Sequence, residues 1–215
     1  MSTLTFLLVI LSAVLHASWN FVAKKYAGNY SVIYLSFLFS SVVTGLISIP
    51  FLGDVRLTTE LIVLLMATGV FHAVYGFVLT FTYMNGDIST LYPIVRGSGI
   101  AGAVILSMVI LREQVEPVSG FGVATVISGI AILSYRRNRK ATSPKGIFLA
   151  LICGSLIMSY TIMDKLLVTE VHPIPVMAAS QIISVLMFLP YVLLKIRLNW
   201  HPCNPFRMDH RESKA

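Results

Sequence analysis

Charged residues are scarce in this chain. Lys and Arg number 16 and Asp and Glu number 9, so 12% of the 215 residues are charged, whereas 56% are hydrophobic and the mean hydropathy is +0.83. Soluble domains carry about 25% charged residues. The composition therefore excludes an ordinary soluble protein and predicts an integral membrane protein with the lipid bilayer as its first partner. The net charge of +7 bears on orientation and anionic lipid, and no nucleic acid partner is expected.

Motifs for nucleotide hydrolysis and for catalysis are missing as well. The sequence contains no Walker-type glycine loop, no HExxH, no Gly-x-Ser-x-Gly and no cluster of His, Cys and Asp. Its two cysteines, Cys153 and Cys203, fall in a predicted span and in a polar tail, so no disulfide or metal framework follows. We therefore expect no enzymatic activity, no cofactor and no metal site.

Seven long apolar segments are present, each bounded by charged or turn-forming residues. A helix rises 1.5 Å per residue, so about 20 apolar residues cross the roughly 30 Å hydrocarbon core. Strands of a barrel would instead be short and would alternate in polarity. The sequence thus predicts an all-α integral membrane protein with about seven transmembrane helices. The predicted spans are 4–22, 32–51, 61–83, 92–111, 118–135, 146–167 and 174–196.

The first and sixth predicted spans resemble each other. Ser18-Trp19-Asn20 aligns with Ser159-Tyr160-Thr161, and Lys24 aligns with Lys165. Five spans, counting the first, precede the second copy, so it enters the membrane in the opposite direction, as in the inverted repeats of many secondary transporters. The predicted organisation is a five-helix unit at 1–138, a basic linker at 139–145, two helices of an inverted second unit at 146–196 and a polar tail at 197–215.

The distribution of positive charge predicts an orientation. The positive-inside rule places the loop richest in Lys and Arg in the cytoplasm. That loop carries Arg136, Arg137, Arg139, Lys140 and Lys145. We therefore expect a multi-pass protein of the cell inner (plasma) membrane with its N-terminus outside and its C-terminus inside.

Three helices carry short motifs of a known transporter type. The residues concerned are 18–24 (SWNFVAK) in the first helix, Tyr92-Pro93 and Leu111-Arg112-Glu113 in the fourth, and Gly120, Gly122 and Gly129 in the fifth. In these residues the chain resembles the drug/metabolite transporter superfamily and its EamA-type domain, which is built of ten helices as two inverted five-helix units. The resemblance implies a permease that moves a small polar or anionic metabolite or drug by alternating access, with proton coupling as one option.

The resemblance covers one complete five-helix unit and two helices of a second. Three interpretations are open: a truncated or frameshifted gene, a half-transporter completed by homodimerisation, and a seven-helix protein of another kind. We favour truncation, which would impair transport. The alternative function is a non-transporting structural or regulatory membrane subunit that dimerises through its glycine seams.

Arg96 is the most costly residue to place in a membrane, at about 2.5–3.5 kcal/mol on insertion scales. A fourth helix that begins at Tyr92 or Pro93 would place Arg96 about 5 Å along the axis from its start. Two interpretations follow: the guanidinium snorkels to lipid phosphates, or it clamps a carboxylate or phosphate of a substrate. The glycines that follow it favour the clamp, because small residues let a ligand or a neighbouring helix approach the backbone.

Further polar side chains in the spans predict the rest of a substrate site. In the first helix, His16 and Asn20 share a face with Trp19 beside it, and the third helix would supply a second wall. Packing and interhelical hydrogen bonds are the alternative use of such residues. Asp164 is either a proton-coupling residue or part of an ion pair at the membrane surface. The substrate-binding candidates are Arg96, Tyr92, Asn20, Trp19, His16, His72 and Tyr75.

Overall fold

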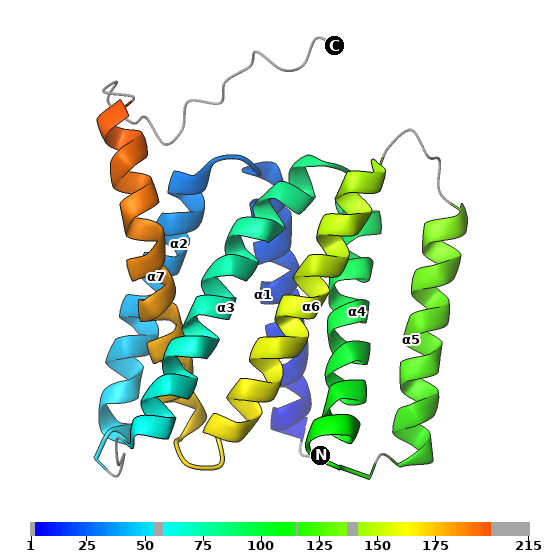
Figure 1. The fold of residues 1–215 in the computed structure, drawn as a ribbon, viewed down its shortest axis with the longest axis horizontal. Coiled ribbons are helices and arrows are strands. Elements are labelled where there is room, and N and C mark those ends of the chain that lie inside the picture. Colours follow the sequence, from blue (N-terminus) through cyan, green and yellow to red (C-terminus); the bar gives the residue numbers. More distant parts are fainter. Residues whose placement is uncertain (1–2, 54–57, 115, 137–141, 199–215) are drawn as a thin grey trace.

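A computed structural model describes residues 3–53, 58–114, 116–136 and 142–198 of the chain. Part of the predicted linker at 139–145 lies outside these residues. So does almost all of the polar tail at 197–215. The described parts are helical throughout (Figure 1), which confirms the predicted all-α fold. The elements are α1 Thr3–Lys25, α2 Tyr30–Ser48, η1 Ile49–Phe51, α3 Thr59–Met84, α4 Ile88–Ile110, α5 Pro117–Arg136, α6 Pro144–Leu167 and α7 Pro173–Leu198.

Each predicted span corresponds to one helix. Six of the helices are long and apolar enough to cross a membrane, and the apolar stretch of α5 within the described residues is shorter, Pro117–Ile132. The turn between α3 and α4 is formed by Asn85-Gly86-Asp87, which lies between the predicted spans 61–83 and 92–111. Consecutive helices run in alternating directions, so α1 and α6 are antiparallel, as the inverted repeat requires (Figure 1).

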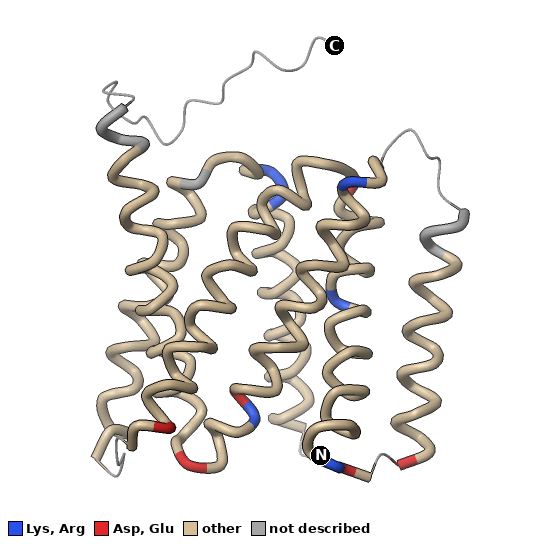
Figure 2. Tube along the Cα trace, in the orientation of Figure 1, with Lys and Arg blue, Asp and Glu red and all other residues tan. Residues whose placement is uncertain are grey.

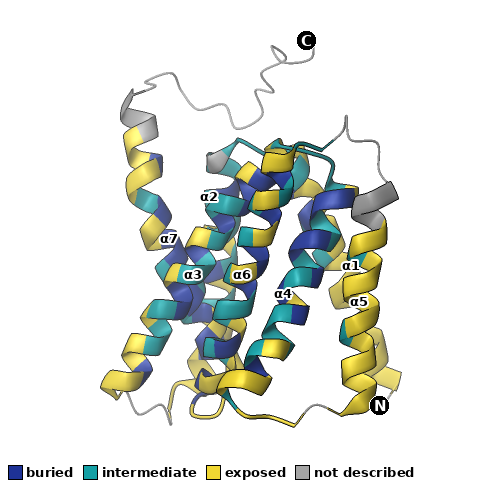
Figure 3. Cartoon of the chain, turned by 45° about the vertical axis from the view of Figure 1, so that its right-hand side comes forward, coloured by how far each residue is buried: buried dark blue, intermediate teal, exposed yellow. Residues whose placement is uncertain are grey.

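The two helices that we predict to begin a second unit, α6 and α7, pack directly on helices of the predicted first unit. The α6 helix lies against α3 and α4, and α7 lies against α2 and α3. The α5 helix packs on α4, and α1 packs mainly against α3. Figure 3 shows α5 largely exposed, whereas α3, α4 and α6 bury the sides that face one another. The core of the bundle is therefore built where α3, α4 and α6 meet.

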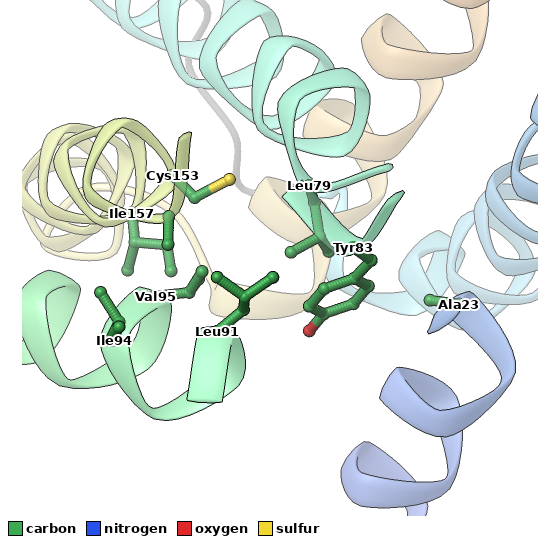
Figure 4. Close-up of a cluster of buried hydrophobic side chains, with 9 residues drawn as sticks. Ala23, Leu79, Tyr83, Leu91, Ile94, Val95, Cys153 and Ile157 are labelled. Carbon is green, nitrogen blue, oxygen red and sulfur yellow. The ribbon is translucent and has the colours of Figure 1, made fainter. Parts of the chain in front are cut away.

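A buried apolar cluster fills this junction. Figure 4 shows its side chains between α3, α4 and α6, with Ala23 of α1 at the edge. Its members are Ala23, Leu79, Tyr83, Leu91, Ile94, Val95, Ala150, Cys153 and Ile157. Cys153 is fully buried in this cluster and its thiol is free. It therefore contributes to the packing of the core. The cluster fixes the relative positions of the helices that carry the polar residues discussed below.

Glycines allow α4 and α6 to approach closely. A Cβ on Gly154 of α6 would lie 2.0 Å from the Ser98 hydroxyl and 3.1 Å from the backbone nitrogen of Gly99 in α4. The glycines after Arg96 serve the same purpose, since a Cβ on Gly99 would meet Ile157 of α6 and one on Gly97 would meet Ile130 of α5. These glycines therefore admit neighbouring helices, which is one of the two uses expected for them.

The charged residues gather at the two ends of the bundle, apart from one basic position midway along α4 (Figure 2). Lys24 and Lys25 end α1 and Lys145 begins α6, so they share the end that we call the basic end. At this end Lys24 Nζ donates to the carbonyl oxygens of Tyr83 and Gly86, the latter at 2.7 Å. The backbone N–H of Ser143 donates to the Asn85 carbonyl at 3.2 Å. These bonds join α1, the α3–α4 turn and the start of α6.

Candidate functional site

Arg96 lies deeper in the bundle than the sequence indicates. The α4 helix begins at Ile88, so the expectation that it begins at Tyr92 or Pro93 is wrong. The backbone N–H of Leu91 already donates to the Asp87 carbonyl at 2.9 Å, and a proline inside the first two turns removes only one helical hydrogen bond. Eight residues separate Ile88 from Arg96, which is about 12 Å along the axis rather than about 5 Å.

At that depth the Arg96 guanidinium contacts protein groups. Its Nη2 is hydrogen-bonded to Nε2 of His16 in α1, with Arg96 donating. The charge also interacts electrostatically with Tyr75, Tyr83 and Tyr160. No carboxylate of the described residues forms a salt bridge with Arg96. The structure thus gathers one cation, one imidazole and three phenols from α1, α3, α4 and α6.

Asn20 and Tyr83 form a buried hydrogen bond next to this group. The Tyr83 hydroxyl donates to Asn20 Oδ1 at 2.8 Å, and Asn20 Nδ2 donates to the His16 carbonyl at 2.8 Å. Asn20 is 3% exposed and Tyr83 is 0% exposed. The predicted Tyr92 lies farther away, with its ring 6.4 Å from the His16 ring. Asn20 therefore positions the turn of α1 that carries His16.

Tyr83→Phe should destabilise the protein by about 1 kcal/mol, because it removes the donor to Asn20 and leaves a buried amide oxygen unpaired. Thermal unfolding of the purified protein, followed by circular dichroism in one detergent, measures the change. The matched control is Tyr34→Phe in α2, which should unfold at the wild-type temperature. Equal stability of the two variants would contradict a structural role for the Asn20–Tyr83 bond.

A second polar group joins α3 and α6. Thr68 Oγ1 donates to Asp164 Oδ1 at 2.6 Å, and His72 Nδ1 lies 2.9 Å from the Thr68 carbonyl oxygen. His72 Nε2 faces Asp164 Oδ2 at 3.9 Å. The neighbouring Lys165 pairs with Glu113 instead, at 2.5 Å. Asp164, whose side chain is 32% exposed, therefore faces α3 near the end of α6 and is not paired with the lysine beside it.

Tyr160 connects the two groups. Its ring stacks on that of His72, with 3.9 Å between centroids and 27° between planes, and Tyr75 meets it edge-on at 5.9 Å. Tyr160 interacts electrostatically with both Arg96 and Asp164. Tyr160 is thus close enough to both the basic residue and the carboxylate to interact with each.

A small cavity lies beside the Arg96 group, between α1, α2 and α3. Its volume is about 30 Å³, room for a water molecule or two but not for a metabolite. The predicted residues Trp19 and Tyr75 both line it. The full lining is Trp19, Ala23, Ile33, Phe37, Tyr75, Gly76, Leu79, Thr80 and Tyr83. Binding of a substrate here would require the helices to move apart.

Three residues of this arrangement were not among the predicted site residues: Thr68, Tyr83 and Tyr160. The repeat offered a signal for Tyr160, because it aligns with Trp19. Thr68 offered none, since a threonine in an apolar helix usually bonds to the preceding turn. Ser12, one turn before His16 in α1, is exposed.

Residues 3–135, which include most of α1 to α5, match the model of a family described as the EamA-like transporter family. The match covers more than half of the chain and ends close to the predicted end of the first five-helix unit. Both His16 and Arg96 lie inside the matched region, and Tyr160 and Asp164 lie beyond it. No curated protein matches the chain.

Proposed function

The chain belongs to the EamA-like transporter family, and from this premise we propose that it is an inner-membrane permease for a small anionic metabolite. The observation that carries the proposal is the position of Arg96. Its charge lies about 12 Å inside α4 and has no carboxylate partner among the described residues. Ionisable residues at such depth are expensive and usually mark a substrate or ion pathway.

The surroundings of Arg96 suit an anion. A guanidinium carries five N–H donors in a planar fork that matches a carboxylate or a phosphate. In the present arrangement Arg96 donates to His16 and interacts with Tyr160, which are neutral groups that contribute no negative charge. Tyr75 and Tyr160 bring hydroxyl groups that can donate to an anion near the guanidinium, whereas the Tyr83 hydroxyl already donates to Asn20. An anionic ligand would therefore gain both charge neutralisation and hydrogen bonds.

Movement by alternating access is the mode of transport we propose. The cavity of about 30 Å³ beside Trp19 and Tyr75 is too small for a metabolite, so the ligand has to enter when the helices separate. Bonds from Lys24 and Ser143 close the basic end over this region. The helices that would separate there are α1, α3 and α6.

The distribution of charge supports a topology with the basic end in the cytoplasm. Lys24, Lys25 and Lys145 lie at this end, whereas Glu60, Glu113 and Glu170 lie in segments at the opposite end (Figure 2). Cytoplasmic loops carry the excess of Lys and Arg in membrane proteins. Because α1 runs toward the basic end, the proposed topology has the N-terminus outside.

A thermal-shift screen tests whether the protein binds anionic ligands. Ligands that bind the folded protein raise its unfolding temperature, in proportion to RT ln(1 + [L]/Kd). We expect compounds from a panel of monocarboxylates, dicarboxylates and phosphate monoesters to stabilise the purified protein, whereas quaternary ammonium dyes and neutral sugars should not.

The matched variants are Arg96→Gln and Arg112→Gln. The stabilisation by anions should disappear in Arg96→Gln and persist in Arg112→Gln, because Arg112 lies after the end of α4. Stabilisation by cations alone, or by anions equally in both variants, would reject the anionic substrate.

A further inference from the structure

We propose that His72 and Asp164 together hold one proton, and that binding of this proton favours binding of an anion at Arg96. The proposal rests on the transport of an anion proposed above and adds the site of coupling to it. It is carried by the geometry of Thr68, His72, Tyr160 and Asp164. The first two lie one turn apart in α3, and the last two lie one turn apart in α6.

The hydrogen bonds indicate how the proton is held. The contact of His72 Nδ1 with the Thr68 carbonyl oxygen, at 2.9 Å, assigns the hydrogen of the neutral imidazole to Nδ1. The lone pair is then on Nε2, which faces Asp164 Oδ2 at 3.9 Å. Thr68 Oγ1 donates to the other carboxylate oxygen at 2.6 Å. Two acceptors thus face each other at a distance longer than a hydrogen bond, and one proton added to either group would make their contact attractive.

The fixed contacts leave little freedom for another arrangement. The Thr68 side chain and carbonyl bind both partners, so they hold the imidazole and the carboxylate in register. The ring of Tyr160 covers one face of the imidazole at 3.9 Å. Such support is what distinguishes a proton site from two ionisable groups that happen to be near each other.

The helices around α3 bring few other ionisable groups to this site. From α6 come Tyr160 and Lys165, and Lys165 is paired with Glu113. From α1 comes His16 and from α4 comes Arg96, which interact with each other. Tyr75 of α3 itself meets Tyr160. The α7 helix has Tyr191 as its only titratable residue between Pro173 and Leu194, and carries no charge there.

Tyr160 gives the proton site its connection to Arg96. It interacts electrostatically with both Arg96 and Asp164, and its ring stacks on that of His72. With Asp164 ionised and His72 neutral, the pair carries one negative charge. This charge repels a ligand anion and so offsets part of the attraction that Arg96 exerts on the ligand. One added proton brings the pair to zero net charge, so an anion then binds more tightly, and by linkage the anion strengthens proton binding. On this proposal the anion and the proton are transported together.

Infrared spectroscopy of the reconstituted protein during a pH titration tests the site without any substrate. In the wild type the carboxyl C=O band and an imidazole band should change over the same pH range, because two strongly interacting groups titrate as a pair. Asp164→Asn should lose the part of the carboxyl band that changes together with the imidazole band. His72→Gln should keep that band but lose the imidazole change and shift the titration of the carboxyl group.

Two further variants keep the test decisive if Asp164→Asn does not fold. Thr68→Val removes the donor to the ionised carboxylate and should move the titration to higher pH by about one unit. Arg96→Gln removes a positive charge and should move it in the same direction. The control Glu170→Gln, an exposed residue beyond α6, should leave the titration unchanged.

A carboxyl titration that is the same in His72→Gln and Thr68→Val as in the wild type would overturn the proposal. So would independent pH ranges for the carboxyl and imidazole bands. Failure of the anion screen with a normal infrared result would reject the anionic substrate and leave the proton site standing. The two proposals therefore fail separately.

Discussion

Arg96→Gln should lower the affinity for the transported anion by about 30-fold or more, and uptake into vesicles should fall with it. Removing one partner of a buried, hydrogen-bonded charge pair costs about 2–5 kcal/mol, and each 1.4 kcal/mol is tenfold in affinity. In this site the Arg96 charge interacts with His16 and with the three tyrosines. The glutamine keeps much of the side-chain length but carries no charge.

This effect can be measured as counterflow in proteoliposomes. The labelled anion is one that raises the unfolding temperature in the thermal-shift screen. Arg96→Lys is the informative companion, because it keeps the charge but lacks the planar fork. We expect it to retain more uptake than Arg96→Gln but less than the wild type. Wild-type uptake by an Arg96→Gln protein that is inserted at wild-type abundance would show that the guanidinium has no role in binding.

The sequence predicts the helices of this protein well for a physical reason. Hydrocarbon requires every backbone polar group to be satisfied within the segment, so a long apolar run has few alternatives to a helix. The start of α4 shows the limit of this reasoning. Pro93 is favourable at the first helical position, but it does not require the helix to start there. The helix begins at Ile88, and the polar residues Ser89 and Thr90 made that start hard to recognise from hydropathy.

Sequence alone indicates those residues of the candidate site whose side chains are unfavourable in a membrane span. Arg96, His16 and Asp164 stand out because a charged or imidazole side chain in a span needs a partner. The partners were not predictable in the same way. Thr68 lies 96 residues before Asp164, and their contact depends on how α6 packs against α3. Only the internal repeat pointed to Tyr160, through its alignment with Trp19.

The contact between α4 and α6 decides whether these residues meet at all. Gly154→Leu should destabilise the protein by about 3 kcal/mol or more, because an overpacked core costs about 1–3 kcal/mol even when smaller groups are added. A Cβ at Gly154 would already lie 2.0 Å from the Ser98 hydroxyl and 3.1 Å from a backbone nitrogen of α4. The side chain of Ser98 can turn away, but the backbone cannot, so α6 has to move.

The matched control is Gly122→Leu in α5, where a Cβ meets nothing within 4 Å. It should change the unfolding free energy by no more than about 0.5 kcal/mol. Unfolding in mixed micelles, followed by circular dichroism, compares the two variants. Because α6 carries both Tyr160 and Asp164, the displacement in Gly154→Leu should also uncouple the carboxyl titration from Arg96. A Gly154→Leu protein as stable as Gly122→Leu would mean that the helices are not in the close contact described.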